Sequence, residues 1–293
     1  MANGARGITI FAVPYDSGHR ALRMGAGPDH LLSNGVEAVL AATGREIHSE
    51  VLEVTSPFRA EIATAFELFG ILAKRVHEAT ALGSFPLVLS GNCNATVGVI
   101  AGLAGAPPKE EEVGLIWLDG HADFNTPETT TSGFLDGMGL SMAVGHCWAQ
   151  MVRAIPAFRP VREEHIVLIG SRGATQVEKE QLRKSGVTVV EELSVSELDG
   201  GRALDIALNA VGDRVRRVHV HLDLDVLDPE AVGPANEFAP EGGISAEEAQ
   251  ACVWAIRERF EVASATVASY DPSFDYEGRV LRAGIALVRA LTM

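Results

Sequence analysis

The sequence has few cysteines, few basic residues and no long apolar run, and each shortage excludes a class of protein. Cys93, Cys147 and Cys252 are an odd number and lie far apart, which argues against a disulfide framework and favours a reducing cytoplasm. Lysine and arginine total 24 against 39 acidic residues, and the formal charge of −15 argues against nucleic acid or an anionic membrane as a partner. No secretion signal opens the chain and no uncharged apolar run is long enough to span a bilayer, so we expect a soluble cytoplasmic protein.

The remaining composition is that of a globular protein with ample core, because 47% of the residues are hydrophobic and 22% are charged. Nothing marks a linker, so we predict one domain over residues 1–293. Apolar segments alternate with helical ones, such as Pro28–Leu40 and Asp136–Ile155, which predicts a three-layer α/β/α domain around an eight-stranded, mostly parallel sheet. The predicted strands are Ile8–Val13, Glu46–Val54 at the edge, Pro86–Leu89, Val113–Leu118, Ile166–Ile169, Val187–Val190, Val218–Leu224 and Ala265–Tyr270.

The first chemical motif follows the segment Val113–Leu118, which is short, aliphatic and typical of a strand buried on both faces. Directly after it come Asp119, His121 and Asp123, in the pattern Asp-x-His-x-Asp. This alternation aims the three side chains at one place, and their oxygen and nitrogen atoms suit a divalent metal such as Mn, Fe, Co or Zn. The alternative is a loop that solvates its own charges.

A second charged motif ends the predicted strand Val218–Leu224. Strict alternation predicts that His219, His221, Asp223 and Asp225 share one strand face. Two carboxylates on adjacent positions of one face repel each other unless a bound cation supplies the counter-charge. The four carboxylates of the two motifs, with the histidine of the first, are about what two divalent ions need for a bridged cluster.

Three motifs carry a resemblance to a known family. They are Asp-Gly-His-Ala-Asp-x-Asn-Thr-Pro at 119–127, Asp-Leu-Asp-Val-Leu-Asp-Pro at 223–229, and Gly27-Pro28 near the start. The chain resembles the ureohydrolase superfamily of arginase, agmatinase and formimidoylglutamase, from about Phe11 to the C-terminus. The resemblance implies an arginase-like fold and hydrolysis of a small guanidino or amidine substrate.

The resemblance also implies a ligand set for two Mn²⁺ ions per chain, namely Asp119, His121, Asp123, Asp223 and Asp225. The family's sixth protein ligand is a histidine in the motif Gly-Gly-Asp-His-Ser. Here the aligned residues 90–94 read Ser-Gly-Asn-Cys-Asn, so we expect Cys93 to ligate in the histidine's place. The alternative is that Cys93 is a small buried residue beside the metals, because manganese prefers oxygen and nitrogen ligands.

A second departure concerns proton transfer. Arginase has a histidine at the position of Asp136, thought to carry protons to the leaving amine. Asp136 titrates near neutrality only if its surroundings raise its pKa, so it is either the acid or a plain loop carboxylate. His221 is the other catalytic hypothesis, against the alternative of a hydrogen-bonded core histidine.

The third departure concerns substrate recognition. Ser269 stands where arginase and agmatinase have a glutamate that pairs with the guanidinium. The family's acids for the α-amino group align with Gly173 and Thr175. The positions that bind the α-carboxylate in arginase are occupied here by polar side chains: Asn125, Thr130 and Ser132.

These departures favour a binuclear manganese hydrolase of an amidine C–N bond, and specifically an Nω-hydroxy-L-arginine amidinohydrolase releasing hydroxyurea and ornithine. The hydroxyl lowers the basicity of the guanidine, so a neutral form needs no paired carboxylate, and it adds an oxygen that a donor such as Ser269 or an exposed metal site can hold. The alternatives are another ureohydrolase, or a metal-binding relative without turnover. The oligomeric state stays open, a homo-oligomer included.

Overall fold

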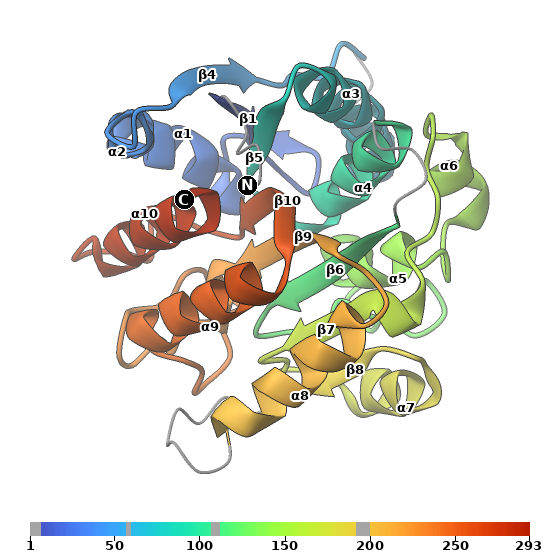
Figure 1. Cartoon of the computed structure of the whole chain (residues 1–293). Helices are drawn as coiled ribbons and strands as arrows, with labels where there is room; N and C mark the ends of the chain where they lie inside the picture. The colour runs from blue at the N-terminus through green and yellow to red at the C-terminus, as the bar shows by residue number, and fades with distance from the viewer. Residues whose placement is uncertain (1–6, 57–59, 107–111, 192–199) are drawn as a thin grey trace.

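The computed structural model describes residues 7–56, 60–106, 112–191 and 200–293 (Figure 1). Eight strands form one sheet in the order β4-β1-β5-β10-β9-β6-β7-β8, and each pair of neighbours is parallel. They are β1 (Gly7–Val13), β4 (Glu46–Val51), β5 (Ser84–Ser90), β6 (Val113–Leu118), β7 (Ile166–Ile169), β8 (Thr188–Val190), β9 (Arg217–Asp223) and β10 (Glu261–Ala268). The predicted fold class and the predicted edge position of β4 are confirmed.

Helices cover both faces of the sheet, as Figure 1 shows. One face carries α1 (Gly27–Ser33), α2 (Val36–Ala41), α8 (Gly200–Gly212), α9 (Ala246–Arg259) and α10 (Arg279–Thr292). The other carries α3 (Glu61–Ala81), α4 (Thr96–Gly105), α5 (Gly139–Ala143), α6 (Ala149–Ala154) and α7 (Gln176–Lys184). Within the described residues, no helix is both long and apolar enough to cross a membrane.

Short elements join these helices and strands. The 3-10 turns are η1 (Arg23–Ala26), η2 (Cys93–Ala95), η3 (Asp136–Met138), η4 (Glu163–His165) and η5 (Leu224–Val226), and β2 (Tyr15–Asp16) pairs with β3 (His19–Arg20). Two predicted helices are wrong in extent, because Pro28–Leu40 and Asp136–Ile155 are each divided. The chain turns through left-handed backbone at Gly35 (φ 95°) in the first case and at Trp148 (φ 51°) in the second.

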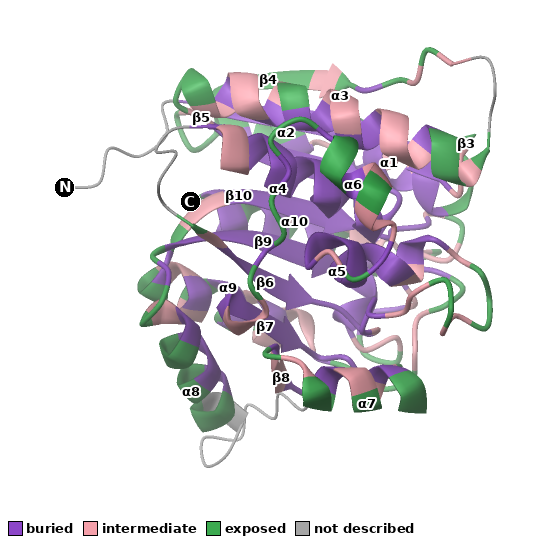
Figure 2. Ribbon diagram, turned by 90° about the vertical axis from the view of Figure 1, so that its right-hand side faces the viewer, coloured by how far each residue is buried: buried purple, intermediate pink, exposed green. Residues whose placement is uncertain are grey.

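The central strands are buried on both faces, which Figure 2 shows as purple arrows between the helix layers. On β9, Val218, Val220 and Leu222 belong to the apolar core that also includes residues of α8, α9 and α10. The alternate residues His219 and His221 are equally buried but point to the opposite face. The polar side chains of β9 therefore lie on the face that α4 and α5 cover.

The order of the sheet brings four strand ends together. The strands β5, β10, β9 and β6 are consecutive neighbours, so the segments that follow them emerge side by side at one edge. A Cβ at Gly27 would collide with the carbonyl of Tyr270, so the segment after β10 packs directly on the start of α1. This contact gives the Gly27-Pro28 junction a steric reason at the same edge.

Candidate functional site

The charged motifs meet at this edge of the sheet. Asp119, His121 and Asp123 follow β6, and Asp223 ends β9. Asp225 lies one turn further on in η5, so the prediction that it shares the strand face of Asp223 is wrong. The Asp223 carboxylate accepts the N–H of Asp225 at 2.7 Å and turns the chain, yet the Asp225 Oδ2 still reaches the His121 Nδ1 at 3.1 Å.

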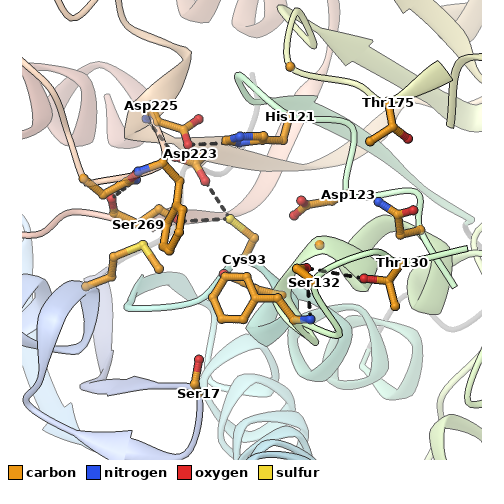
Figure 3. A pocket seen from close by; sticks show the side chains of 18 of the residues that line it. Ser17, Cys93, His121, Asp123, Thr130, Ser132, Thr175, Asp223, Asp225 and Ser269 are labelled. Atoms are coloured by element: carbon orange, nitrogen blue, oxygen red, sulfur yellow. Dashed lines mark hydrogen bonds and ion pairs between the residues drawn. The ribbon is translucent and has the colours of Figure 1, made fainter. Parts of the chain in front are cut away.

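These residues line a cavity of about 370 Å³ (Figure 3). Ten of the twelve side chains predicted for the site line it: Cys93, His121, Asp123, Asn125, Thr130, Ser132, Asp136, Asp223, Asp225 and Ser269. The other two, Asp119 and His221, are fully buried behind the wall of the cavity. The sequence therefore brought together residues from four strand ends.

The carboxylates of the cluster repel one another. Burial raises the pKa of Asp119, Asp123 and Asp223 well above the usual range, and the charges of neighbouring carboxylates raise it further. Burial also acts to raise the pKa of Asp225, but the hydrogen bond and charge of His121 bring it below its ordinary value. Burial acts to lower the pKa of His121, but the hydrogen bond and charge of Asp225 raise it to about 9. Such a cluster favours an added positive charge.

Two buried polar atoms of the site have no hydrogen-bond partner, namely Asp123 Oδ2 and His221 Nε2. Among the described residues, three groups have possible ligand atoms within 4.8 Å of one another: Cys93 with Asp119 and His221, Cys93 with Asp123 and Asp136, and Asp119 with His121 and Asp225. Unpartnered buried oxygens and nitrogens are costly unless something binds them. The donor set therefore fits divalent metal ions.

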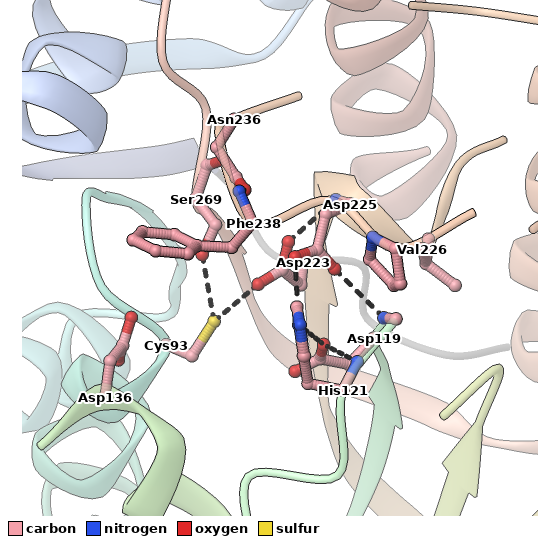
Figure 4. A network of polar contacts seen from close by, with 12 residues as sticks. Cys93, Asp119, His121, Asp136, Asp223, Asp225, Val226, Asn236, Phe238 and Ser269 are labelled. Atoms are coloured by element: carbon pink, nitrogen blue, oxygen red, sulfur yellow. Dashed lines mark hydrogen bonds and ion pairs between the residues drawn. The ribbon is translucent and has the colours of Figure 1, made fainter. Parts of the chain in front are cut away.

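Cys93 lies in η2, directly after β5, and it is buried. Its Sγ donates to Asp223 Oδ2 at 2.8 Å and lies 3.1 Å from Ser269 Oγ (Figure 4). Burial and the charge of Asp223 raise the pKa of the thiol well above its ordinary value. Ser269 itself follows β10 with left-handed backbone, at φ 65°. The thiol thus lies between the carboxylate of Asp223 and the hydroxyl of Ser269.

Asp136 is buried in η3, and both of its oxygens accept hydrogen bonds. The donors are the backbone N–H of Asn94 at 2.9 Å and the side-chain amide of Asn92 at 2.8 Å. Burial raises the pKa of Asp136 to about 7. The surroundings of Asp136 therefore raise its pKa to near neutrality, which is what a proton donor at this position requires.

His221 has the surroundings of a core residue. Its ring stacks on Trp117 with centroids 3.8 Å apart, and its Nδ1 lies 2.9 Å from Thr96 Oγ1. Burial lowers the pKa of His221 well below its ordinary value, so the ring is neutral. Because it does not line the cavity, His221 is placed to support the cluster rather than to touch a substrate.

The far end of the cavity is rich in hydroxyls. Thr130 Oγ1 accepts the N–H of Gly133 at 3.0 Å and lies 3.4 Å from Ser132 Oγ. Asn125 also lines the cavity there, and Figure 3 shows Thr130 and Ser132 together on one side of it. Gly173 and Thr175 line the cavity without a charge of their own.

Sequence reasoning missed several lining residues. Glu178 is buried, and it accepts hydrogen bonds from Phe124 N and from both polar groups of Thr175. The signal for it was present, because Thr175-x-x-Glu178 is a capping box. Phe134, Phe238, Asn236 and Arg23 also line the cavity and carried no comparable signal.

Strained backbone is concentrated around the cavity. Among the described residues, seven other than glycine have left-handed φ angles, and four of these line the cavity: Ser17, Arg23, Asp123 and Ser269. Such conformations cost about 1 kcal/mol or more each and cluster at functional sites. The distribution independently marks this edge of the sheet as the site.

Comparisons with known proteins agree with this geometry. The model of the Arginase family matches residues 6–293. The arginase of Brevibacillus brevis is 30% identical over 299 residues, which cover 98% of this chain and 97% of the relative. The structures of the arginases of Bacillus caldovelox and Bacillus cereus match with TM-scores of 0.88 and 0.86 at 28% and 27% identity, each over 98% of both chains.

Proposed function

This chain belongs to the arginase family and is a hydrolase of C–N bonds in linear amidines, and we propose its substrate from that premise. The proposed substrate is Nω-hydroxy-L-arginine, and the products are hydroxyurea and ornithine. The observation that carries the proposal is Ser269, a neutral and buried residue beside Cys93. Because the described part of the site offers no carboxylate there, a strongly basic guanidinium would lack its counter-charge.

The family implies a binuclear manganese centre, and the donor set fits it. The proposed ligands are Cys93, Asp119, His121, Asp123, Asp223 and Asp225. Two manganese ions bound there supply a water molecule activated as a nucleophile and positive charge to offset the charge that develops in the reaction. The raised pKa values of three of the carboxylates, and the unpartnered oxygen of Asp123, support this assignment.

Three residues of the chain have separate roles toward the substrate. Ser269 Oγ holds the added hydroxyl oxygen of the N-hydroxyguanidine, since it faces the cavity 3.1 Å from Cys93 Sγ. Asp136, whose pKa burial raises to about 7, exchanges a proton near neutral pH and delivers one to the leaving amine. His221 keeps its place behind them through Thr96 and Trp117.

The amino-acid end of the substrate lies at the hydroxyl-rich end of the cavity. Asn125, Thr130 and Ser132 hold the α-carboxylate, which favours an amino acid over a decarboxylated amine such as agmatine. Gly173 and Thr175 leave the α-amino group without the acids expected at these positions. Recognition of this end therefore depends on the carboxylate.

Hydrolysis of L-arginine is the second candidate, because the relatives compared above are arginases. Paired kinetics separate the two functions. Manganese-loaded protein is assayed on Nω-hydroxy-L-arginine, L-arginine, agmatine and formiminoglutamate, with kcat/KM as the measure. We expect the hydroxylated amino acid to be the best substrate, and equal or better turnover of L-arginine would refute the proposal.

A further inference from the structure

Two phenylalanines form a pair that lines the cavity. The ring centroids of Phe134 and Phe238 are 5.7 Å apart, with an interplanar angle of 43°. Phe238 is 44% exposed although it belongs to a cavity wall. Exposed aromatic faces that meet in a cavity are typical of a ligand contact, because the faces bind planar groups.

Both rings are held by the segments that carry the proposed substrate contacts. The N–H of Phe238 donates to Asn236 Oδ1 at 2.8 Å, and Asn236 Nδ2 donates to the carbonyl of Ser269 at 2.8 Å. The N–H of Phe134 donates to Ser132 Oγ at 3.2 Å. In Figure 4, Phe238 extends from the loop of Asn236 toward the side of the site where Cys93 and Asp136 lie. The ring contact thus joins the segment anchored at Ser269 to the segment that carries Ser132.

The carboxylates that line the cavity are all engaged elsewhere. Asp123, Asp223 and Asp225 belong to the proposed metal site. Asp136 accepts two hydrogen bonds from residues near Cys93, and Glu178 accepts its bonds from Phe124 and Thr175. Among the described residues, the one lining carboxyl that the proposed function brings to the amidine is Asp136, and it acts as a proton donor at the leaving amine rather than as a counter-charge for the head.

We propose that Phe134 and Phe238 hold the planar amidine head of the substrate by its face, in place of a carboxylate at its edge. A flat amidine stacks on an aromatic ring whether or not it is charged. An ion pair with a carboxylate would favour the basic guanidinium. The aromatic pair does not require a positive charge, so a weakly basic N-hydroxyguanidine can also bind. The proposal deepens the proposed function, on which its choice of N-hydroxyguanidine rests.

Ligand binding tests the proposal apart from turnover. Calorimetry on manganese-loaded protein compares Nω-hydroxy-nor-L-arginine, which carries the N-hydroxyguanidine head on a chain one methylene shorter, with L-ornithine, which lacks the head. Phe238→Leu keeps an apolar side chain but removes the ring. We expect it to weaken binding of the N-hydroxyguanidine by about tenfold, since 1.4 kcal/mol corresponds to a factor of ten. Binding of L-ornithine should stay unchanged.

Two further variants complete the design. Phe134→Leu should weaken the same ligand in the same direction, and Tyr276→Leu is the matched control, because Tyr276 is 93% exposed and does not line the cavity. Equal weakening of both ligands in Phe238→Leu, or no change in either, would overturn the proposal. If wild-type protein prefers L-arginine in turnover while the head-specific loss persists, the proposed function fails and the aromatic contact stands.

Discussion

The two walls of the cavity differ in how they carry charge. The acidic wall, made of His121, Asp123, Asp223 and Asp225 with Asp119 buried behind it, gathers buried carboxylates that repel one another. The neutral wall, made of Ser269, Phe134 and Phe238, presents a hydroxyl and two rings. The comparison indicates that metal binding and substrate binding depend on separate groups of residues. The acidic wall matches the motifs of the arginase family, and the neutral wall departs from them.

The difference follows from what each wall has to bind. Buried carboxylates repel one another unless a cation or a proton neutralises them, so the acidic wall is constrained by the metal centre that the family implies, whatever the substrate. The neutral wall faces the organic substrate and is free to change with it. A change on the acidic wall should therefore remove activity on every substrate, and a change on the neutral wall should redistribute activity among substrates.

Asp223→Ala tests the acidic wall and should have the largest effect. Asp223 contacts both Cys93 and the Asp225 N–H, so its loss also disturbs two other proposed ligands. We expect most bound manganese to be lost and kcat/KM to fall by more than about a hundredfold on every substrate, because loss of a residue that merely supports a ligand already costs about 10- to 100-fold. Metal content by elemental analysis is the decisive measurement.

The matched control is Asp213→Ala, since Asp213 has an 80% exposed side chain beside Arg259. It should keep both its metal and its activity. Retention of two manganese ions per chain by Asp223→Ala would contradict the assignment of the acidic wall.

Ser269→Glu tests the neutral wall by restoring a carboxylate opposite the amidine. A hydrogen bond to a charged group contributes about 1.5 to 3 kcal/mol, so the ratio of kcat/KM for L-arginine to that for Nω-hydroxy-L-arginine should rise about 10- to 100-fold. Ser269→Gln is the matched control of equal size without charge. The same rise in both variants would show that size rather than charge decides the preference.

The sequence predicted one wall better than the other for a physical reason. The acidic wall follows apolar strands in fixed alternation, so Asp119, His121 and Asp123 could be located from local pattern alone. Asp225 was misplaced on the strand face because the turn of η5 depends on one hydrogen bond from its own N–H to Asp223. The roles of Cys93 and Ser269 were assigned only by resemblance, and their contact joins segments 176 positions apart.

The loops were the least predictable part of the site. Phe134 and Phe238 meet although neither lies in a regular element, and no local pattern specifies such a pair. The divided helix before Ile155 depends on left-handed backbone at Trp148, a residue type that does not signal it. In contrast, strands such as β5, β6 and β7 were predicted because buried parallel strands have continuous apolar sequences, and the exposed edge strand β4 was predicted from its alternation.

His219→Gln sharpens the comparison at the base of the acidic wall and should have the smallest effect. His219 is fully buried on the same face of β9 as Asp223, bonded through its two ring nitrogens to Ser264 and Thr266, and burial lowers its pKa to about 3. The unfolded chain takes up a proton at this histidine below about pH 6.5, and the folded protein does not until about pH 3. Its contribution to stability is therefore complete above pH 6.5 and is lost as the pH falls, by about 1.4 kcal/mol per pH unit.

The free energy of unfolding of metal-free protein, measured with denaturant at pH 7, 6 and 5, should fall less steeply in His219→Gln than in wild type. The exposed His48 on β4 supplies the control variant His48→Gln, which should keep the wild-type slope. A slope in His219→Gln equal to that of wild type would mean that His219 takes up its proton in the folded protein as readily as in the unfolded chain.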